Sequence, residues 1–185
     1  MEPHEIIQQF DIAKAMPISL DQIRQIAPPD ARVVTYAELA NMDSLADLFG
    51  HSKHVILHIP IDSLQSGHWV CIILHDNLVE YHDSYGRGPD DAILHSSPAV
   101  RLQLSKQGIN LTELGRLLTG HRVAWSNVIL QKEGDNHQEC GYFVACRLGH
   151  ADMLPDTYLD WITSFPVEPD YVAFLYCLDI IDKQP

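Results

Sequence analysis

The chain has 185 residues, 46% of them hydrophobic, and a formal net charge of −13. This length can bury a substantial core, so we expect a single domain over residues 1–185. The acidic balance disfavours binding to a nucleic-acid backbone, which depends on clustered Lys and Arg. No apolar stretch approaches the length of a membrane span, and the first residues lack the pattern of a signal peptide. The four cysteines show no paired spacing, which favours reduced thiols over a disulfide scaffold.

The first third of the chain predicts two helical segments and a strand. Residues 19–22 (Ser-Leu-Asp-Gln) form a capping box for a short helix that must end before the two prolines that follow. Residues 35–38 (Thr-Tyr-Ala-Glu) form a second box. The segment after it is expected to be helical as far as Phe49, with a break near residues 41–44. Residues 54–61 are typical of a strand.

A hairpin and further helices are expected next. Residues 69–74 form a nearly continuous apolar strand, and residues 78–82 form its partner across a turn at residues 75–77. The remaining elements are expected to be helices at 99–107 and 112–118, a strand at 122–130, a helix from Cys140, and helices at 155–164 and 169–181. Helices before and after a small sheet predict an α+β fold.

Cys140 lies at the expected start of a helix. The apolar, β-branched residues 122–130 indicate a buried strand, and a polar loop separates them from Cys140. A cysteine in the first turn of a helix lies near the positive end of the helix dipole and near unpaired backbone N–H groups. Both favour the thiolate, so Cys140 is a candidate nucleophile. A small buried cysteine fits this stretch equally well.

His68 and Asp83 are expected to meet across the hairpin. His68 begins one strand and Asp83 ends the other, so a turn near residues 75–77 places them roughly opposite each other. A carboxylate there can accept the imidazole N–H, fix the tautomer and stabilise the imidazolium. A structural hydrogen bond is the alternative interpretation of this pair. Each of the other ten histidines fits a surface, loop or strand position.

Together these motifs resemble the adenain-like and SUMO-protease-like cysteine peptidases. The resemblance covers roughly residues 54–150 and rests on four short motifs in the superfamily's order: His68-Trp69, Asp83-Ser84, Gln131 and Cys140-Gly141. It implies a papain-like fold variant of the adenain type. Such a fold has a small mixed or antiparallel sheet flanked by helices, with the catalytic cysteine at a helix N-terminus.

The resemblance assigns a role to each matched residue. Cys140 is the nucleophile, His68 the general base and Asp83 the residue that orients His68. Gln131 would donate its side-chain amide to the oxyanion, together with the backbone N–H of Cys140. The nine-residue step from Gln131 to Cys140 is longer than the family's usual spacing, which makes Gln138 a rival donor. We prefer Gln131 because the end of a strand would hold it rigidly.

Trp69 and Gly141 are expected to support the substrate and the oxyanion. Trp69 would form a wall beside His68, although a core aromatic is equally compatible. No cofactor and no metal are expected. The adenovirus enzyme is basic and uses DNA as a cofactor, and this activation is not carried over to a strongly acidic chain.

Within the superfamily the chain looks most like the maturation proteases of viruses, virophages and virus-like transposons. Those enzymes cleave capsid or scaffold precursors. The main alternative is an isopeptidase that removes SUMO or another ubiquitin-like modifier, and a superfamily acyltransferase is a third. Either protease implies a protein substrate, no membrane partner and an intracellular site in the host cytoplasm or nucleus, or packaging in the virion. The need for an activating peptide stays open.

A non-enzymatic zinc module is a further alternative. His137, Cys140, Cys146 and His150 could be written as a zinc-binding quartet. Cys146 follows apolar residues in the expected helix, so a core position suits it better. A zinc role would also leave the pattern of His68 and the residues matched with it unexplained.

Overall fold

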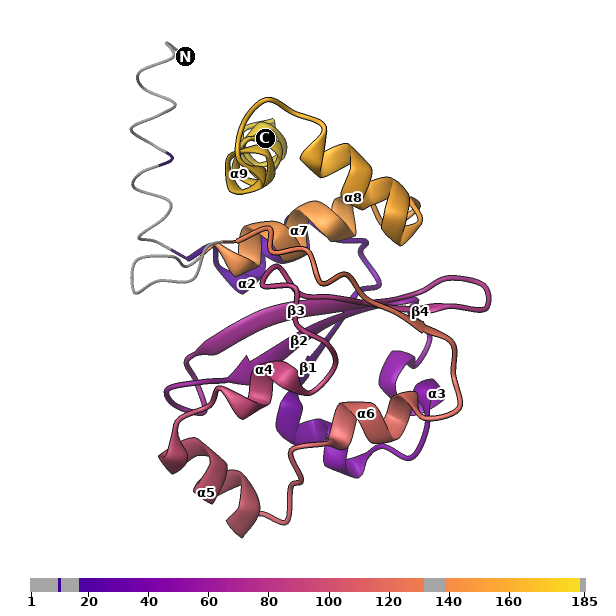
Figure 1. Ribbon diagram of the computed structural model, residues 1–185, viewed down its shortest axis with the longest axis vertical. Coiled ribbons are helices and arrows are strands. Elements are labelled where there is room, and N and C mark those ends of the chain that lie inside the picture. Colours follow the sequence, from indigo (N-terminus) through magenta and orange to yellow (C-terminus); the bar gives the residue numbers. More distant parts are fainter. Residues whose placement is uncertain (1–9, 11–16, 132–138, 184–185) are drawn as a thin grey trace.

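A five-stranded mixed sheet forms the centre of the molecule (Figure 1). The computed structural model describes residue 10, residues 17–131 and residues 139–183. The strands are β1 (Arg32–Thr35), β2 (His54–Pro60), β3 (Gly67–Leu74), β4 (Val79–His82) and β5 (Val123–Ala124). They lie in the order β1-β2-β3-β4-β5. The β1–β2 and β4–β5 pairs are parallel, and the two central pairs are antiparallel.

Helices cover both faces of this sheet, which confirms the predicted α+β class. On one face lie α2 (Leu20–Ile26), α7 (Cys140–Gly149), α8 (Pro155–Thr163) and α9 (Pro169–Ile181) (Figure 1). The other face packs against η1 (Tyr36–Asn41), α3 (Leu45–Phe49), α4 (Asp91–Leu94), α5 (Pro98–Lys106) and α6 (Glu113–Leu118). The domain therefore has three layers, with one hydrophobic core above the sheet and one below.

The central strands have apolar side chains on both faces because both faces are covered. Successive residues of a strand point to opposite sides, so Val55 and Leu57 join one core while Ile56 joins the other. In β3, Cys71 and Ile73 pack under α7. Nearly continuous apolar runs are the pattern of such doubly covered strands, which is why β2 and β3 could be predicted from the sequence.

The predicted helix starts are also confirmed. Ser19 caps α2: its hydroxyl accepts the Gln22 N–H at 3.2 Å, and the Gln22 side chain accepts the Ser19 N–H at 3.0 Å. The segment after Thr35 is helical in two pieces, η1 and α3, with the predicted break between them. Ser44 caps the second piece by accepting the Asp47 N–H at 3.3 Å. Cys140 is the first residue of α7, as expected.

The predicted strand over residues 122–130 is wrong in length and in burial. In the described part of the chain, Val123 and Ala124 are the residues of this segment that pair with β4. Strand β4 is four residues long, so it offers no backbone partners to the rest of the segment. The chain then runs without regular pairing, and Trp125 and Ile129 expose 53% and 67% of their surface. Strand β1, which pairs with β2, was not predicted.

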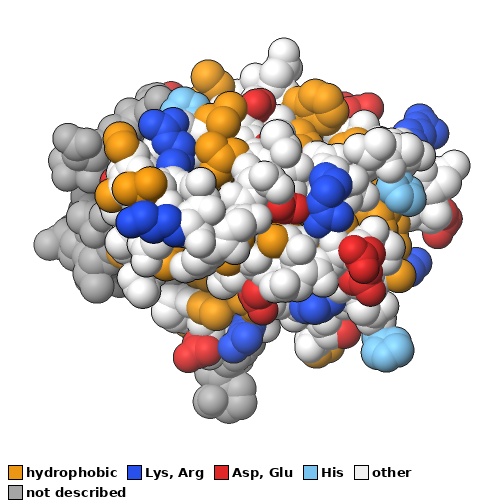
Figure 2. Space-filling model, turned by 90° about the horizontal axis from the view of Figure 1, so that it is seen from below, with side chains coloured by type: hydrophobic (Ala, Val, Ile, Leu, Met, Phe, Trp, Pro, Cys, Tyr) orange, Lys and Arg blue, Asp and Glu red, His pale blue; other side chains and the backbone are white. Residues whose placement is uncertain are grey.

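Figure 2 shows one face of the molecule, seen from below relative to the view in Figure 1. Acidic, basic and apolar side chains are interspersed on this face. In the part of the chain that the structure describes, no helix is both long and apolar enough to cross a bilayer.

Candidate active site

His68 and Asp83 meet at the end of the β3–β4 hairpin. His68 Nε2 lies 2.9 Å from Asp83 Oδ1, and both side chains are buried. The ladder pairs Cys71 with His82, and continuing it sets Asp83 level with Val70. The two residues are therefore diagonal neighbours on one face, two positions from direct opposition, which agrees with the prediction that they lie roughly opposite each other. Their predicted contact is confirmed.

The environment of His68 favours the imidazolium. Burial alone would lower the pKa of His68, but the Asp83 carboxylate and a hydrogen bond with Cys140 raise that pKa to about 10. Nε2 is the ring nitrogen that contacts Asp83. Burial also works against the Asp83 carboxylate, whose pKa is nevertheless lowered by His68 and by the backbone N–H of Tyr85. An acid, a base and a thiol are thus connected in series.

Cys140 reaches this pair because α7 is fixed against its neighbours. Gly141 packs so closely on Ile18, which precedes α2, that an added Cβ would lie 2.3 Å from the Ile18 side chain. Near the other end of the helix, the guanidinium of Arg147 donates to both carboxylate oxygens of Glu80 in β4, at 2.7 and 2.6 Å. The predicted role of Gly141 in supporting the oxyanion stays a prediction, and close packing is what the structure gives it.

Gln131 is buried beside the same turn, but no strand holds it. It follows the unpaired segment after β5, so our reason for preferring it was wrong. Instead, the backbone N–H groups of Leu130 and Gln131 both donate to the carbonyl of Ser84 at 2.9 Å. The Ser84 hydroxyl donates to Gln131 Oε1 at 2.7 Å, and Gln131 Nε2 donates to Glu139 Oε2 at 3.2 Å. The rival donor, Gln138, lies outside the described residues.

Trp69 lies next to His68 in sequence but is directed to the other face of the sheet. Its indole is tilted against the ring of His58 on β2, with centroids 4.8 Å apart, and it packs with the core under α7. Tyr85 is the aromatic residue whose ring lies beside His68, at 4.9 Å between centroids. The guanidinium of Arg87 covers the Tyr85 ring at 4.6 Å.

Three residues of the site were not predicted from the sequence as site residues: Ser84, Tyr85 and Glu139. Ser84 was noted only as part of a motif, and its adjacency to Asp83 was the available signal. Tyr85 and Glu139 flank matched positions, but nothing in a single sequence indicates that their side chains turn inward.

The zinc alternative gains no support from the geometry. Cys146 is buried in the core under α7, and the His150 ring contacts the backbone oxygen of Cys146 at 2.9 Å. His137 lies outside the described residues. Among the residues that are described, no group of three or more His, Cys, Asp or Glu side chains is arranged to hold a metal ion.

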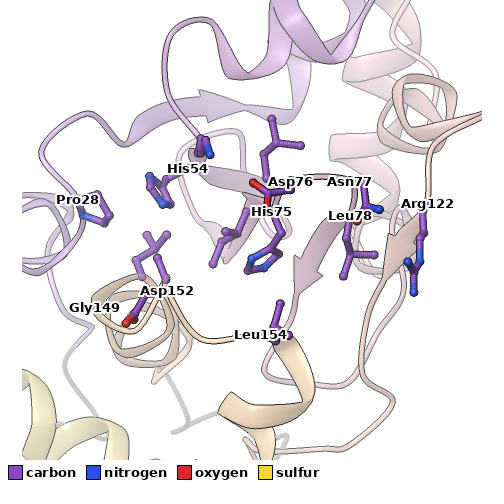
Figure 3. A pocket seen from close by; sticks show the side chains of 15 residues that line it. Pro28, His54, His75, Asp76, Asn77, Leu78, Arg122, Gly149, Asp152 and Leu154 are labelled. Carbon is purple, nitrogen blue, oxygen red and sulfur yellow. The ribbon is translucent and has the colours of Figure 1, made fainter.

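A separate hollow of about 800 Å³ lies at the far end of the hairpin (Figure 3). Its walls include His54, the β3–β4 turn with His75, and the connection after α7 with Asp152. Leu74 lies six positions after His68 along β3, so this hollow is about 20 Å from the His68–Asp83 pair. None of the predicted site residues lines it. This hollow and the chemically organised site are therefore different places.

Comparison with known proteins links the chain to a virophage. No protein-family model matches the sequence. The chain is similar to the uncharacterized protein V9 of the Sputnik virophage, with 27% identity over 145 residues. The match covers 76% of this chain and 82% of V9. This similarity points to a viral setting, and the activity has to be argued from the site itself.

Proposed function

We propose that the protein is a cysteine endopeptidase of the adenain-like, papain-related type that processes capsid or other structural precursors of a virus or virus-like element. The observation that carries the proposal is the series Asp83–His68–Cys140. A buried carboxylate contacts a histidine at 2.9 Å, and Cys140, at the first position of a helix, contributes with that carboxylate to the raised pKa of the histidine. The similarity to V9 supports the viral setting.

The proposed reaction is acyl transfer through a thioester. The Cys140 thiolate attacks the carbonyl carbon of the scissile bond, and the imidazolium of His68 gives its proton to the leaving amine as the C–N bond breaks. Water then attacks the thioester, with His68 as the base that takes the water's proton. Asp83 holds the ring in place and stabilises its charged form throughout.

Charge that develops on the substrate oxygen needs donors near Cys140. The backbone N–H of Cys140 is in the first turn of α7, where N–H groups have no partner within the helix. The amide of Gln131 is assigned as the second donor because it is bonded to Glu139, the residue before Cys140. Removal of such a donor from an acyl-transfer enzyme lowers kcat by about 10²–10³.

Two electrophilic probes test this proposal. One is a short glycine-containing peptide aldehyde, and the other is a ubiquitin-like modifier with a C-terminal warhead. We expect the peptide probe to label the wild type but not Cys140→Ala. Cys177→Ala, which removes a buried thiol, is the control and should be labelled like the wild type. Labelling by the modifier probe instead would replace the processing protease with a deconjugase. If neither probe labels the protein and Cys140 is alkylated slowly below pH 7, the assignment of Cys140 as an activated nucleophile is refuted.

A further inference from the structure

Ser84 holds the backbone and the side chain of Gln131 at once. Its carbonyl accepts the N–H groups of Leu130 and Gln131, both at 2.9 Å, and its hydroxyl donates to Gln131 Oε1 at 2.7 Å. Ser84 and Gln131 expose 2% and 1% of their surface, so water does not compete for these bonds. One serine therefore fixes both the position of Gln131 and the oxygen end of its amide.

Glu139 fixes the other end of the same amide. Its Oε2 accepts from Gln131 Nε2 at 3.2 Å, and Glu139 is buried directly before Cys140. A carboxylate only accepts hydrogen bonds, so it must face the nitrogen of the amide and would repel the oxygen. Ser84 on the oxygen side and Glu139 on the nitrogen side together exclude the flipped amide.

The same turn also holds the histidine's carboxylate. The backbone N–H of Tyr85 donates to Asp83 Oδ1 at 2.8 Å, and the Gly86 N–H donates to the Asp83 carbonyl at 3.0 Å. Asp83 contacts His68 from this turn, and the next residue, Ser84, contacts Gln131. Two neighbouring side chains thus serve the two halves of the proposed chemistry.

We propose that Ser84 and Glu139 are positioning residues that direct Gln131 Nε2 toward the first turn of α7, where the oxyanion forms. This inference rests on the proposed function and deepens it by assigning the control of the oxyanion donor to two residues. Stabilisation of an oxyanion depends on donors that are already oriented before charge develops. Loss of either contact lets the amide rotate and weakens transition-state binding without changing the nucleophile.

The experiment compares two reactions of Cys140. A glycine-containing peptide aldehyde adds to the thiol and forms a tetrahedral adduct whose oxygen occupies the oxyanion position. Iodoacetamide alkylates the thiol by displacement of iodide and forms no oxyanion. We expect Ser84→Ala to bind the aldehyde about tenfold more weakly, a part of the 10²–10³ lost with a whole donor. The rate of iodoacetamide alkylation should stay at the wild-type value.

Three further variants complete the test. Ser84→Ala combined with Gln131→Ala should be no weaker toward the aldehyde than Gln131→Ala alone, because both act through one amide. Glu139→Gln keeps an acceptor and should lose less affinity than Glu139→Ala. Ser52→Ala removes a buried hydroxyl that bonds locally, to the backbone of His54, and serves as the matched control.

The outcomes separate the inference from the proposed function. Equal aldehyde affinity in Ser84→Ala and Ser52→Ala, with an active wild type, would overturn the inference alone. Equal losses toward both reagents in Ser84→Ala would also overturn it, since that result indicates general damage to the site. A wild type that neither binds the aldehyde nor alkylates rapidly would overturn the proposed function, and the inference with it.

Discussion

His68 is subject to two opposing effects of its surroundings. Its burial favours the neutral ring, whereas the carboxylate of Asp83 favours the imidazolium and prevails, with the pKa raised to about 10. Among the residues that the structure describes, neighbouring His58 has no such partner, and burial together with the charge of His68 lowers the pKa of His58. The single carboxylate at 2.9 Å therefore decides which of these two histidines is charged at neutral pH.

Replacement of Asp83 should move the alkaline limit of activity. In the wild type, kcat/KM for peptide cleavage should fall at high pH with a midpoint near 10, where His68 loses its proton. Asp83→Asn removes the main effect that raises the pKa while burial remains, so the midpoint should move to lower pH. The exposed Asp62→Asn, with the same change of net charge, should leave it in place. An unchanged midpoint in Asp83→Asn would contradict the assignment.

At the scale of elements, α7 and β4 form one frame. Arg147 is fully buried and bidentate with Glu80, and it also donates to the backbone oxygens of His150 and Met153. His75 contacts the same carboxylate at 2.8 Å. Because Asp83 follows β4 and Cys140 begins α7, this ion pair connects the two elements that supply the acid and the thiol.

Removal of one partner from that ion pair should destabilise the whole domain. Glu80→Gln leaves a buried guanidinium without its counter-charge, and such changes cost about 3–5 kcal/mol. The free energy of unfolding in urea should fall by this order. Arg24→Ala, which breaks the exposed contact with Asp21, should cost less than about 0.5 kcal/mol. Similar losses of stability in the two variants would show that the buried ion pair contributes no more to the free energy of unfolding than the exposed one.

Gly67 sets the approach of β3 to β2 directly before His68. A Cβ at this position would lie 2.0 Å from the backbone oxygen of Ile59, so the two strands would have to separate. Gly67→Ala should displace His68 from Asp83 and lower kcat/KM at least tenfold, with a loss of about 1–3 kcal/mol in stability. Ser66→Ala, at the exposed neighbouring position, should leave both at the wild-type level.

The sequence predicts elements well where one physical signal is sufficient. The capping box at Ser19 and the apolar run of β3 are local patterns, and both define their elements correctly. The strand over residues 122–130 failed because a β-branched apolar run was taken as evidence of burial. Ile129 and its neighbours have the composition of a strand, but the short β4 offers them no partner.

The candidate site shows the same limit. His68, Asp83 and Cys140 could be picked out because a hairpin and a helix start place them, and the contact of His68 with Asp83 is confirmed. The contacts that hold the Gln131 side chain could not be predicted, because they come from Ser84 and Glu139, which are 55 positions apart in the sequence. Side-chain direction at a turn is set by packing that a single sequence does not display.

At the scale of the whole molecule, ionisable groups buried in the three layers should lower the free energy of unfolding both at acidic and at alkaline pH. His82 is buried, and its Nε2 has no hydrogen-bond partner among the residues described. Burial, together with Arg147 and His68, lowers the pKa of His82 to about 4, despite the opposing charges of Glu80 and Asp83. The pKa of His68, in contrast, is raised. The buried thiols of Cys71, Cys146 and Cys177 also have raised pKa values.

The free energy of unfolding should therefore be greatest near neutral pH. Between pH 6.5 and about 4 the unfolded chain binds a proton at His82 that the folded chain does not, so stability falls on acidification. Between pH 6.5 and about 10 the folded chain keeps a proton at His68 that the unfolded chain releases, so stability falls as pH rises. Each such proton contributes a slope of about 1.4 kcal/mol per pH unit.

His82→Phe isolates the acidic side of this dependence. Phenylalanine keeps the edge contact with Tyr158, whose ring centroid lies 5.5 Å from that of His82, but cannot bind a proton. From pH 7 to pH 5, urea unfolding should show a loss of stability about 2 kcal/mol smaller in His82→Phe than in the wild type. His121→Gln, at an exposed position, should follow the wild type. Parallel curves for His82→Phe and the wild type would contradict this assignment, because they would mean that His82 has the same pKa in the folded and the unfolded chain.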